Sequence, residues 1–240
     1  MNEKTTVASV DVVIPVYNEE RVLRQSVDKL WRFLDENVAC EWQIIIADNA
    51  STDGTWEVAQ SLCREYRHVV PLHLDQKGRG RALRRALLDS GADMASYMDV
   101  DLSTDLGAFP ALIRGIEEGY DVVIGSRLAT GASVQRCFRR ELTSRTYNLL
   151  LKAMFRVAFA DAQCGFKAIS RKAAQELVPL TQNQQWFFDT ELLLLALRRG
   201  YRIKEVPVLW VEDPDSRVSV PKVTLEYLKE LLRMRFRPNL

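Results

Sequence analysis

The stretch that decides the fold is VDVVIPVYNEE, residues 10–20, in which a short apolar run changes abruptly to polar residues. The run is rich in β-branched side chains, which favour strands. Similar runs follow along the chain: WQIIIAD (42–48), VVPLHL (69–74), ASYMDV (95–100) and DVVIGS (121–126). Amphipathic segments separate these runs. The alternation predicts βαβ units, and therefore an α/β fold with a mostly parallel sheet flanked by helices.

The second half of the chain departs from this regular alternation. We expect two helices and two strands there, namely a helix over 141–159, a strand over 164–170, a helix over 186–200 and a strand over 201–211. Gly200 is expected to end the second helix. Pro207 indicates an edge position or a bulge for the last strand, because proline has no N–H to donate to a neighbouring strand.

The C-terminal tail, residues 221–240, mixes apolar residues with lysine and arginine. We therefore expect one large domain over 1–220, followed by a basic amphipathic helix over 221–240. Such a helix can lie at the surface of an anionic membrane. Packing against the domain is an equally good interpretation of the same pattern.

The composition excludes several classes of protein. The 240 residues are 47% hydrophobic and 27% charged, as in ordinary globular proteins, and the net charge of +1 argues against a nucleic-acid partner. The cysteines at 40, 63, 137 and 164 are far apart and show no CxxC spacing, so neither a zinc site nor a disulfide scaffold is indicated. No signal peptide and no long apolar span is evident, so we expect a cytoplasmic protein with at most peripheral membrane contact.

Polar residues follow the expected strands at the points where the strands end. Open parallel sheets bind ligands outside the carboxyl ends of their strands. The residues at these points are Tyr17 to Glu20, Asp48 to Gly54, Asp99 with Asp101, and Ser126 with Arg127. Any one of these groups can cap a helix. Their convergence on one edge of the sheet predicts a binding site.

The segment SYMDVDLSTD, residues 96–105, separates two carboxylates by one residue, Asp99 and Asp101. In an extended chain the two side chains would point to the same face, where their like charges repel. A divalent cation would relieve this repulsion, and Mg²⁺ and Mn²⁺ prefer oxygen ligands. On the motif alone, a polar strand end that runs into a turn is the alternative.

Taken together, the segments VVIPVYNEE, IIIADNASTDGT, KGRGRALRRAL, MDVDLSTD, IGSR and DAQCGFKAISR resemble glycosyltransferase family 2, which has the Rossmann-like GT-A fold. They resemble most its polyprenyl-phosphate branch, the dolichyl-phosphate glucose and mannose synthases. The resemblance runs from about residue 10 to about residue 220. It implies an inverting, metal-dependent transferase that uses Mg²⁺ or Mn²⁺ to move a hexose from UDP-glucose or GDP-mannose to a polyprenyl phosphate.

A lipid acceptor implies peripheral contact with the cytoplasmic face of a membrane, made by the tail or by a separate membrane protein partner. Two other functions are open from the sequence. One is a family 2 transferase that acts on a saccharide hydroxyl, which would need a general base. The other is a non-catalytic module that binds a nucleotide-sugar.

The resemblance also implies a donor site at the first loops of the sheet. It assigns the nucleotide pocket to Pro15, Tyr17, Glu19 and Asp48 and the donor phosphates to Lys77. The residue types agree, because Asp48 can accept from a base N–H or a ribose hydroxyl and Tyr17 offers a flat face for stacking. Gly78 and Gly80 would allow close backbone approach. The chain departs from the family at Asn49 and Ala50, where a second acidic residue and a glycine are common.

For the reaction centre, the resemblance implies that Asp101 binds the metal on the donor diphosphate and that Asp99 lies near the metal or the ribose. The resemblance also implies that the acceptor phosphate is bound by Arg127 and either Arg139 or Arg140. Arginine suits this task because its planar fork matches phosphate oxygens. Three acidic residues are candidates for a positioning or base role, and an arginine is expected in the loop over the donor diphosphate: Asp161, Asp189 or Glu191, and Arg217.

Overall fold

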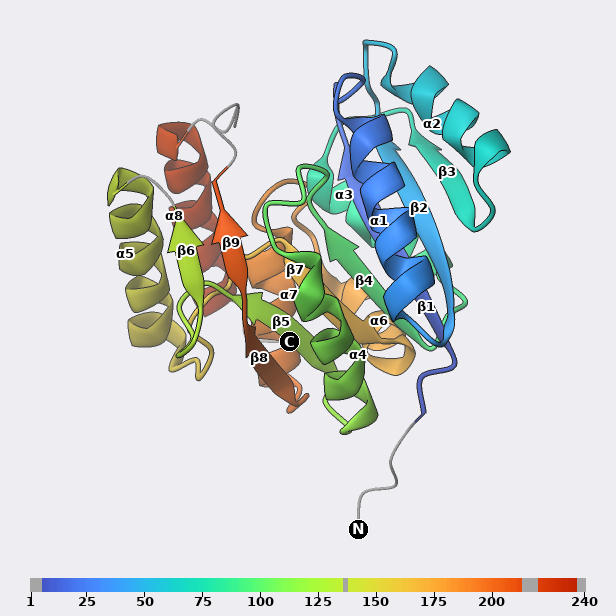
Figure 1. The fold of residues 1–240 in the computed structure, drawn as a ribbon. Helices are drawn as coiled ribbons and strands as arrows, with labels where there is room; N and C mark the ends of the chain where they lie inside the picture. The colour runs from blue at the N-terminus through green and yellow to red at the C-terminus, as the bar shows by residue number, and fades with distance from the viewer. Residues whose placement is uncertain (1–5, 136–137, 213–219, 237–240) are drawn as a thin grey trace.

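The computed structural model describes residues 6–135, 138–212 and 220–236, without the side chains of 138–140 and 220–225. Its centre is a seven-stranded sheet with the order β3-β2-β1-β4-β7-β5-β8 (Figure 1). The strands are β1 (Ser9–Val16), β2 (Glu41–Asn49), β3 (Val69–Leu74), β4 (Met94–Met98), β5 (Val122–Ser126), β7 (Phe166–Ser170) and β8 (Ile203–Pro207). A two-stranded sheet pairs β6 (Ser133–Gln135) with β9 (Leu209–Val211).

The main sheet is parallel except at β7, which runs antiparallel to both β4 and β5. The parallel register places Val16 opposite Asp48, and Asp48 opposite His73. The carboxyl ends of β1, β2 and β3 therefore lie at one edge of the sheet. The expectation of an α/β fold with a mostly parallel sheet is confirmed.

Helices cover both faces of the sheet and form a three-layer arrangement. One face packs against α1 (Leu23–Asn37), α2 (Thr55–Glu65) and α4 (Phe109–Glu117). The other packs against α3 (Arg79–Asp89), α6 (Arg171–Leu177) and α7 (Phe188–Arg198), and α5 (Phe138–Phe155) and α8 (Val220–Phe236) join this second core. Figure 1 shows α5 and α8 side by side, away from the α1–α2 half of the molecule. No helix in the described ranges is long and apolar enough to cross a membrane.

The expected elements are found, with differences in where some of them end. The strand expected over 69–74 has those bounds, whereas the strand expected over 95–100 ends at Met98 because the chain then turns. The single strand expected over 201–211 is two strands that belong to different sheets. Pro207 ends the first of them, β8, which is an edge strand as the proline indicated. Gly200, with φ of +74°, follows α7.

Three residues without the conformational freedom of glycine adopt positive φ directly after strands at this carboxyl edge. Asn18 follows β1 with φ of 56°, Ala50 follows β2 with 57°, and Leu102 lies in the turn after β4 with 49°. Most residues with a side chain are strained at positive φ, and residues in such conformations concentrate at functional sites. At Ala50, where the family resemblance leads us to expect glycine, the backbone conformation is one that glycine adopts without cost.

Candidate active site

The loops after β1 and β2 are tied to each other by hydrogen bonds. The Asn18 side-chain oxygen accepts from the Thr52 backbone N–H at 2.8 Å, and the Asn18 N–H donates to the Ser51 hydroxyl at 3.0 Å. Farther along, the Glu20 carboxylate accepts from the Gly54 N–H at 2.8 Å. These bonds hold the two loops in a fixed arrangement, because each loop provides hydrogen-bond partners for polar groups of the other.

Asp48 is completely buried and already has protein partners. Its Oδ2 lies 2.7 Å from Nδ1 of His73, and its Oδ1 accepts from the Ser51 N–H at 3.3 Å. His73 is exposed, and its ring centroid lies 4.8 Å from that of Trp56. In the Asp48–His73 pair, His73 is the exposed member. The contact of Asp48 with a nucleotide stays a prediction. Sequence reasoning missed His73, although its position opposite Asp48 follows from pairing of the two strands.

The structure brings Lys77 and Tyr17 together, as expected for two residues of one donor pocket. The Lys77 Nζ lies 3.4 Å from the centroid of the Tyr17 ring, which is a cation–π contact. Pro15 and Glu19 are both half-buried on either side of Tyr17, at the end of β1 and in the loop after it. The four residues therefore share the edge at which the resemblance put the nucleotide.

We expected Gly78 and Gly80 to allow close backbone approach to the donor, but the neighbour that they admit is another segment of the protein. A Cβ on Gly78 would lie 2.5 Å from the carbonyl oxygen of Gln184, and one on Gly80 would lie 2.8 Å from the carbonyls of Asn183 and Gln185. The glycines thus permit close approach of the 183–185 segment. The Gly78 N–H also donates to the Asn49 side chain. The asparagine at that departure from the family fastens the β2 loop to the start of α3.

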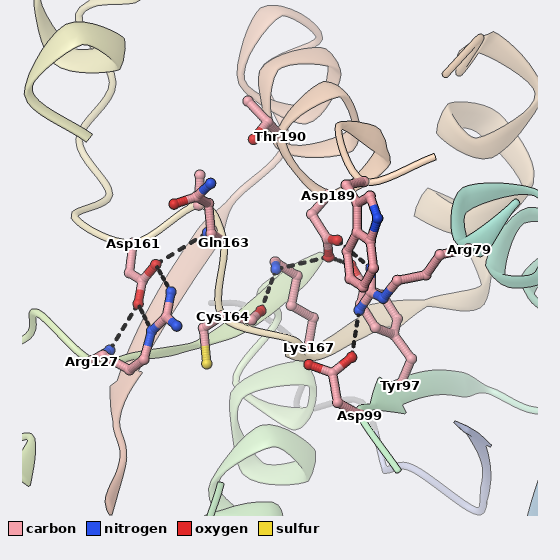
Figure 2. Close-up of polar contacts among 12 residues, drawn as sticks. Arg79, Tyr97, Asp99, Arg127, Asp161, Gln163, Cys164, Lys167, Asp189 and Thr190 are labelled. Carbon is pink, nitrogen blue, oxygen red and sulfur yellow. Dashed lines mark hydrogen bonds and ion pairs between the residues drawn. The ribbon is translucent and has the colours of Figure 1, made fainter. Parts of the chain in front are cut away.

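A buried ionic cluster lies beside Asp99 (Figure 2). Arg79 donates to Asp99 Oδ1 at 2.9 Å and to Asp189 Oδ2 at 2.5 Å. Asp189 Oδ1 accepts from the Tyr97 hydroxyl at 2.6 Å and from Lys167 Nζ at 3.0 Å. Arg79 thereby joins a fully paired internal carboxylate to the more exposed carboxylate of Asp99, and it orients Asp99 at the end of β4.

Among the arginines of α3, Arg79 differs sharply from a solvated helix face. Its side chain is only 8% exposed, and its guanidinium lies 5.3 Å from the centroid of the Trp186 ring. Burial is possible because two carboxylates neutralise it. Arg85, in contrast, is exposed and pairs with Asp89 along the same helix. Arg79, Tyr97 and Lys167 are residues that sequence reasoning missed, and the only local signal was an arginine placed between two glycines.

Burial alone would raise the pKa of the Asp189 carboxyl, but the charges of Arg79 and Lys167 and the hydrogen bond from Tyr97 hold that pKa at about 2. The unfolded chain therefore binds more protons than the folded one between pH 4 and pH 2, and stability falls as pH falls through this window. We expect the wild type to lose roughly 2 kcal/mol more than Asp189→Asn between these pH values. Urea denaturation of both proteins at pH 4 and pH 2 measures this, and equal losses would contradict it.

Asp99 and Asp101 lie in a turn, not in the extended chain that we expected. The Leu102 N–H donates to the Asp99 carbonyl at 3.1 Å and closes the turn. The Asp99 side chain is 46% exposed, and Asp101, also exposed, accepts at Oδ1 from the Ser103 N–H at 2.9 Å. The backbone of Gly165 crowds Asp99, since a Cβ there would lie 2.0 Å from Oδ2.

Asp99 and Asp101 are partly exposed carboxylates, the ligand type that a hard divalent cation prefers. Across the described side chains, no group of three or more His, Cys, Asp and Glu is arranged to hold a metal by itself. Mg²⁺ commonly takes one or two carboxylates and completes its shell with water and phosphate oxygens. Asp99 and Asp101 supply two carboxylates, which is a ligand number of this kind, and their role as metal ligands stays a prediction.

Arg127 and Asp161 form the second ionic group of the site (Figure 2). Arg127 donates from Nε to Asp161 Oδ2 at 2.7 Å and from Nη2 to Oδ1 at 3.0 Å, a bidentate pair. Asp161 is completely buried, and although burial raises the pKa of its carboxyl, Arg127 brings that pKa below the ordinary value. Asp161 is therefore built to hold Arg127. The contact of Arg127 with an acceptor phosphate stays a prediction.

The structure separates the two acidic candidates of α7. Asp189 belongs to the Arg79 cluster, whereas Glu191 accepts from the N–H groups of Gln182 and Asn183 and from Arg233 of α8 at 2.6 Å. Glu191 thus connects α8 to the loop before α7. Arg139 and Arg140 lie in the first turn of α5, where side chains are not described, and Arg217 lies outside the described residues.

The fold is of the GT-A type, in which a mostly parallel sheet carries acidic loops at its carboxyl edge. The chain belongs to glycosyl transferase family 2, whose family model matches residues 11–178. It is 36% identical over 230 residues to the glycosyltransferase AglD of Haloferax volcanii, a match that covers 93% of this chain and 36% of AglD. It is 29% identical over 245 residues to the dolichyl-phosphate beta-glucosyltransferase of Saccharomyces cerevisiae, covering 93% and 73%.

A solved structure has the same fold. The glucosyl-3-phosphoglycerate synthase of Mycobacterium tuberculosis, in complex with Mn²⁺, UDP-glucose and phosphoglyceric acid, superposes with a TM-score of 0.72 at 18% identity. The match covers 95% of this chain and 79% of that protein. The chain therefore spans about a third of the archaeal relative and most of the other two proteins.

Proposed function

We propose that this protein transfers a hexose from a nucleotide-sugar to a polyprenyl phosphate with inversion at the anomeric carbon. The observation that carries the proposal is the position of residues 161–167 between the two ionic groups (Figure 2). In this segment Asp161 holds Arg127, Gly165 contacts Asp99, and Lys167 joins Asp189. One short segment thus connects Arg127, which we assign to the acceptor, with Asp99, which we assign to the donor. The name of the yeast relative supports a dolichyl-phosphate acceptor.

On the donor side, Asp99 and Asp101 would hold a divalent cation together with the donor diphosphate. Such a cation neutralises the charge that develops on a departing nucleoside diphosphate. Mg²⁺ and Mn²⁺ are the two candidates, and Mn²⁺ is the ion in the structural relative. Tyr17, Lys77 and the Asp48–His73 pair would surround the nucleotide, and the resemblance assigns Arg217, which lies outside the described residues, to the diphosphate.

On the acceptor side, a phosphate is already ionised at neutral pH, so no general base has to deprotonate it. Arg127 binds this phosphate together with Arg139 or Arg140. Asp161 acts as a positioning residue, because its bidentate contact fixes the guanidinium plane. The lipid acceptor is reached by peripheral contact at the cytoplasmic face of a membrane, with or without a separate membrane protein partner.

The test compares transfer of radiolabelled sugar to a prenyl phosphate and to the corresponding free prenol. We expect transfer to the phosphate alone, because only the phosphate meets the arginines. Arg127→Ala should raise the acceptor concentration needed for half-maximal rate by about tenfold or more, and Arg127→Lys should restore part of the loss, since lysine lacks the bidentate fork.

Arg85→Ala is the control, because Arg85 is an exposed arginine far from Asp161 and should change neither quantity. Thermal unfolding of each variant separates lost binding from lost folding, since Arg127→Ala leaves the buried Asp161 without its cation. Equal use of prenol and prenyl phosphate by the wild type would overturn the proposal in favour of a hydroxyl acceptor.

A further inference from the structure

The outer faces of α5 and α8 expose an unusual number of large apolar side chains. Five of them are 44–77% exposed, in a protein whose other leucines and isoleucines are mostly buried. They are Leu142 and Leu149 on α5, and Leu228, Leu232 and Phe236 on α8. Their spacing places them along one stripe of each helix. We call these two stripes the α5–α8 face.

The charged residues of this face are all basic. Exposed lysine and arginine side chains lie on the same two helices, namely Arg145, Lys152, Lys229 and Arg235, and Arg156 directly follows α5. None of the exposed side chains described on α5 or α8 is acidic. The glutamates of these helices, Glu141, Glu226 and Glu230, are half-buried, and Glu141 and Glu230 pair with Arg145 and Arg233.

The opposite stripes of the two helices fix them to the protein. Tyr227, Leu231 and Met234 of α8 are buried in the core, as is Leu151 of α5. The rings of Tyr147 and Tyr227 lie 5.1 Å apart and join the helices to each other. Packing therefore uses one stripe, and the exposed leucines are the stripe that the fold leaves uncovered.

Strand β9 carries two further exposed apolar side chains beside the candidate acceptor residue Arg127. Trp210 faces inward, with its ring 5.5 Å from the Arg127 guanidinium. Side chains alternate along a strand, so its neighbours Leu209 and Val211 point the other way, and both are more than half exposed. β9 also contacts the loop after Asp101, because the Asp105 N–H donates to the Leu209 carbonyl at 2.9 Å.

We infer that the α5–α8 face is a membrane-docking surface for an anionic bilayer. Leucine and phenylalanine side chains enter the boundary between headgroups and acyl chains, while lysine and arginine pair with anionic headgroups. A face with basic but no exposed acidic groups fits a negatively charged surface better than it fits a second copy of itself, whose like charges would repel. The inference rests on the proposed function in one respect, namely that docking would bring a lipid acceptor to Arg127.

Vesicle sedimentation tests the inference without donor or acceptor. We expect the wild type to bind vesicles of phosphatidylglycerol and phosphatidylcholine, and to bind pure phosphatidylcholine far less. Leu149→Ser with Leu232→Ser should weaken binding to the anionic vesicles by about tenfold, because both side chains are exposed and would be buried in the bilayer. Lys152→Gln with Lys229→Gln should weaken binding and lower its dependence on salt.

The matched control is Leu88→Ser, since Leu88 on α3 is also exposed, at 39%, and lies outside this face. Unchanged binding of the double leucine variant, or failure of the wild type to bind anionic vesicles, would overturn the inference. So would a dimer in sedimentation velocity that the double leucine variant abolishes. A protein that binds vesicles through this face but transfers no sugar would instead contradict the proposed function.

Discussion

Asp189→Asn is expected to lower the free energy of unfolding by about 3–5 kcal/mol. The substitution keeps the shape of the side chain but removes the negative charge that faces Arg79 at 2.5 Å and Lys167 at 3.0 Å. Lys167 is 1% exposed and cannot turn to water without breaking the core. Lys167 would then face a neutral amide, and Arg79 would keep only the partly exposed Asp99 as its counter-charge, so part of the desolvation cost of these two charges would appear as lost stability.

Urea denaturation at neutral pH measures this effect. Asp89→Asn is the matched control, because Asp89 is exposed and pairs only with Arg85 along α3, so its removal should cost less than about 0.5 kcal/mol. A loss below about 1 kcal/mol for Asp189→Asn would show that the Arg79–Asp189 pairing does not exist in solution.

Asp101→Asn is expected to reduce sugar transfer by about 100-fold or more while the fold stays intact. An amide oxygen carries no net charge and is a weaker ligand for a divalent cation than a carboxylate. Asp101 is exposed, and its described hydrogen bond, from the Ser103 N–H, is one that asparagine can also accept. Stability should therefore change little, in contrast to Asp189→Asn.

The measurement is the transfer rate at saturating donor across a titration of Mg²⁺ and of Mn²⁺. Asp105→Asn serves as the control in the same loop, because Asp105 accepts from the Gly107 N–H and asparagine caps equally well. Near-wild-type turnover of Asp101→Asn with either cation would remove Asp101 from the metal site.

The sequence by itself determined the strands, the charged residues at the strand ends and the family. The runs at 10–16, 42–48 and 69–74 are short and rich in β-branched and other apolar residues, which favours strands. The acidic and basic residues at the strand ends were found for the same reason, because parallel topology brings the carboxyl ends of neighbouring strands to one edge. Pro207 likewise reported its position at an edge through a property of its own backbone.

Tertiary structure alone decided which of these side chains meet. Arg79 is 110 residues from Asp189, and apart from its place between two glycines no local pattern distinguishes it from the exposed Arg85 of the same helix. The glycines at 78 and 80 indicate a close neighbour but not that this neighbour is the 183–185 segment. Periodicity reports only whether a residue tends to be buried, whereas the partner of a buried charge depends on how distant segments pack. For that reason the edge of the sheet was predictable, and the ionic network that holds Asp99 and Arg127 was not.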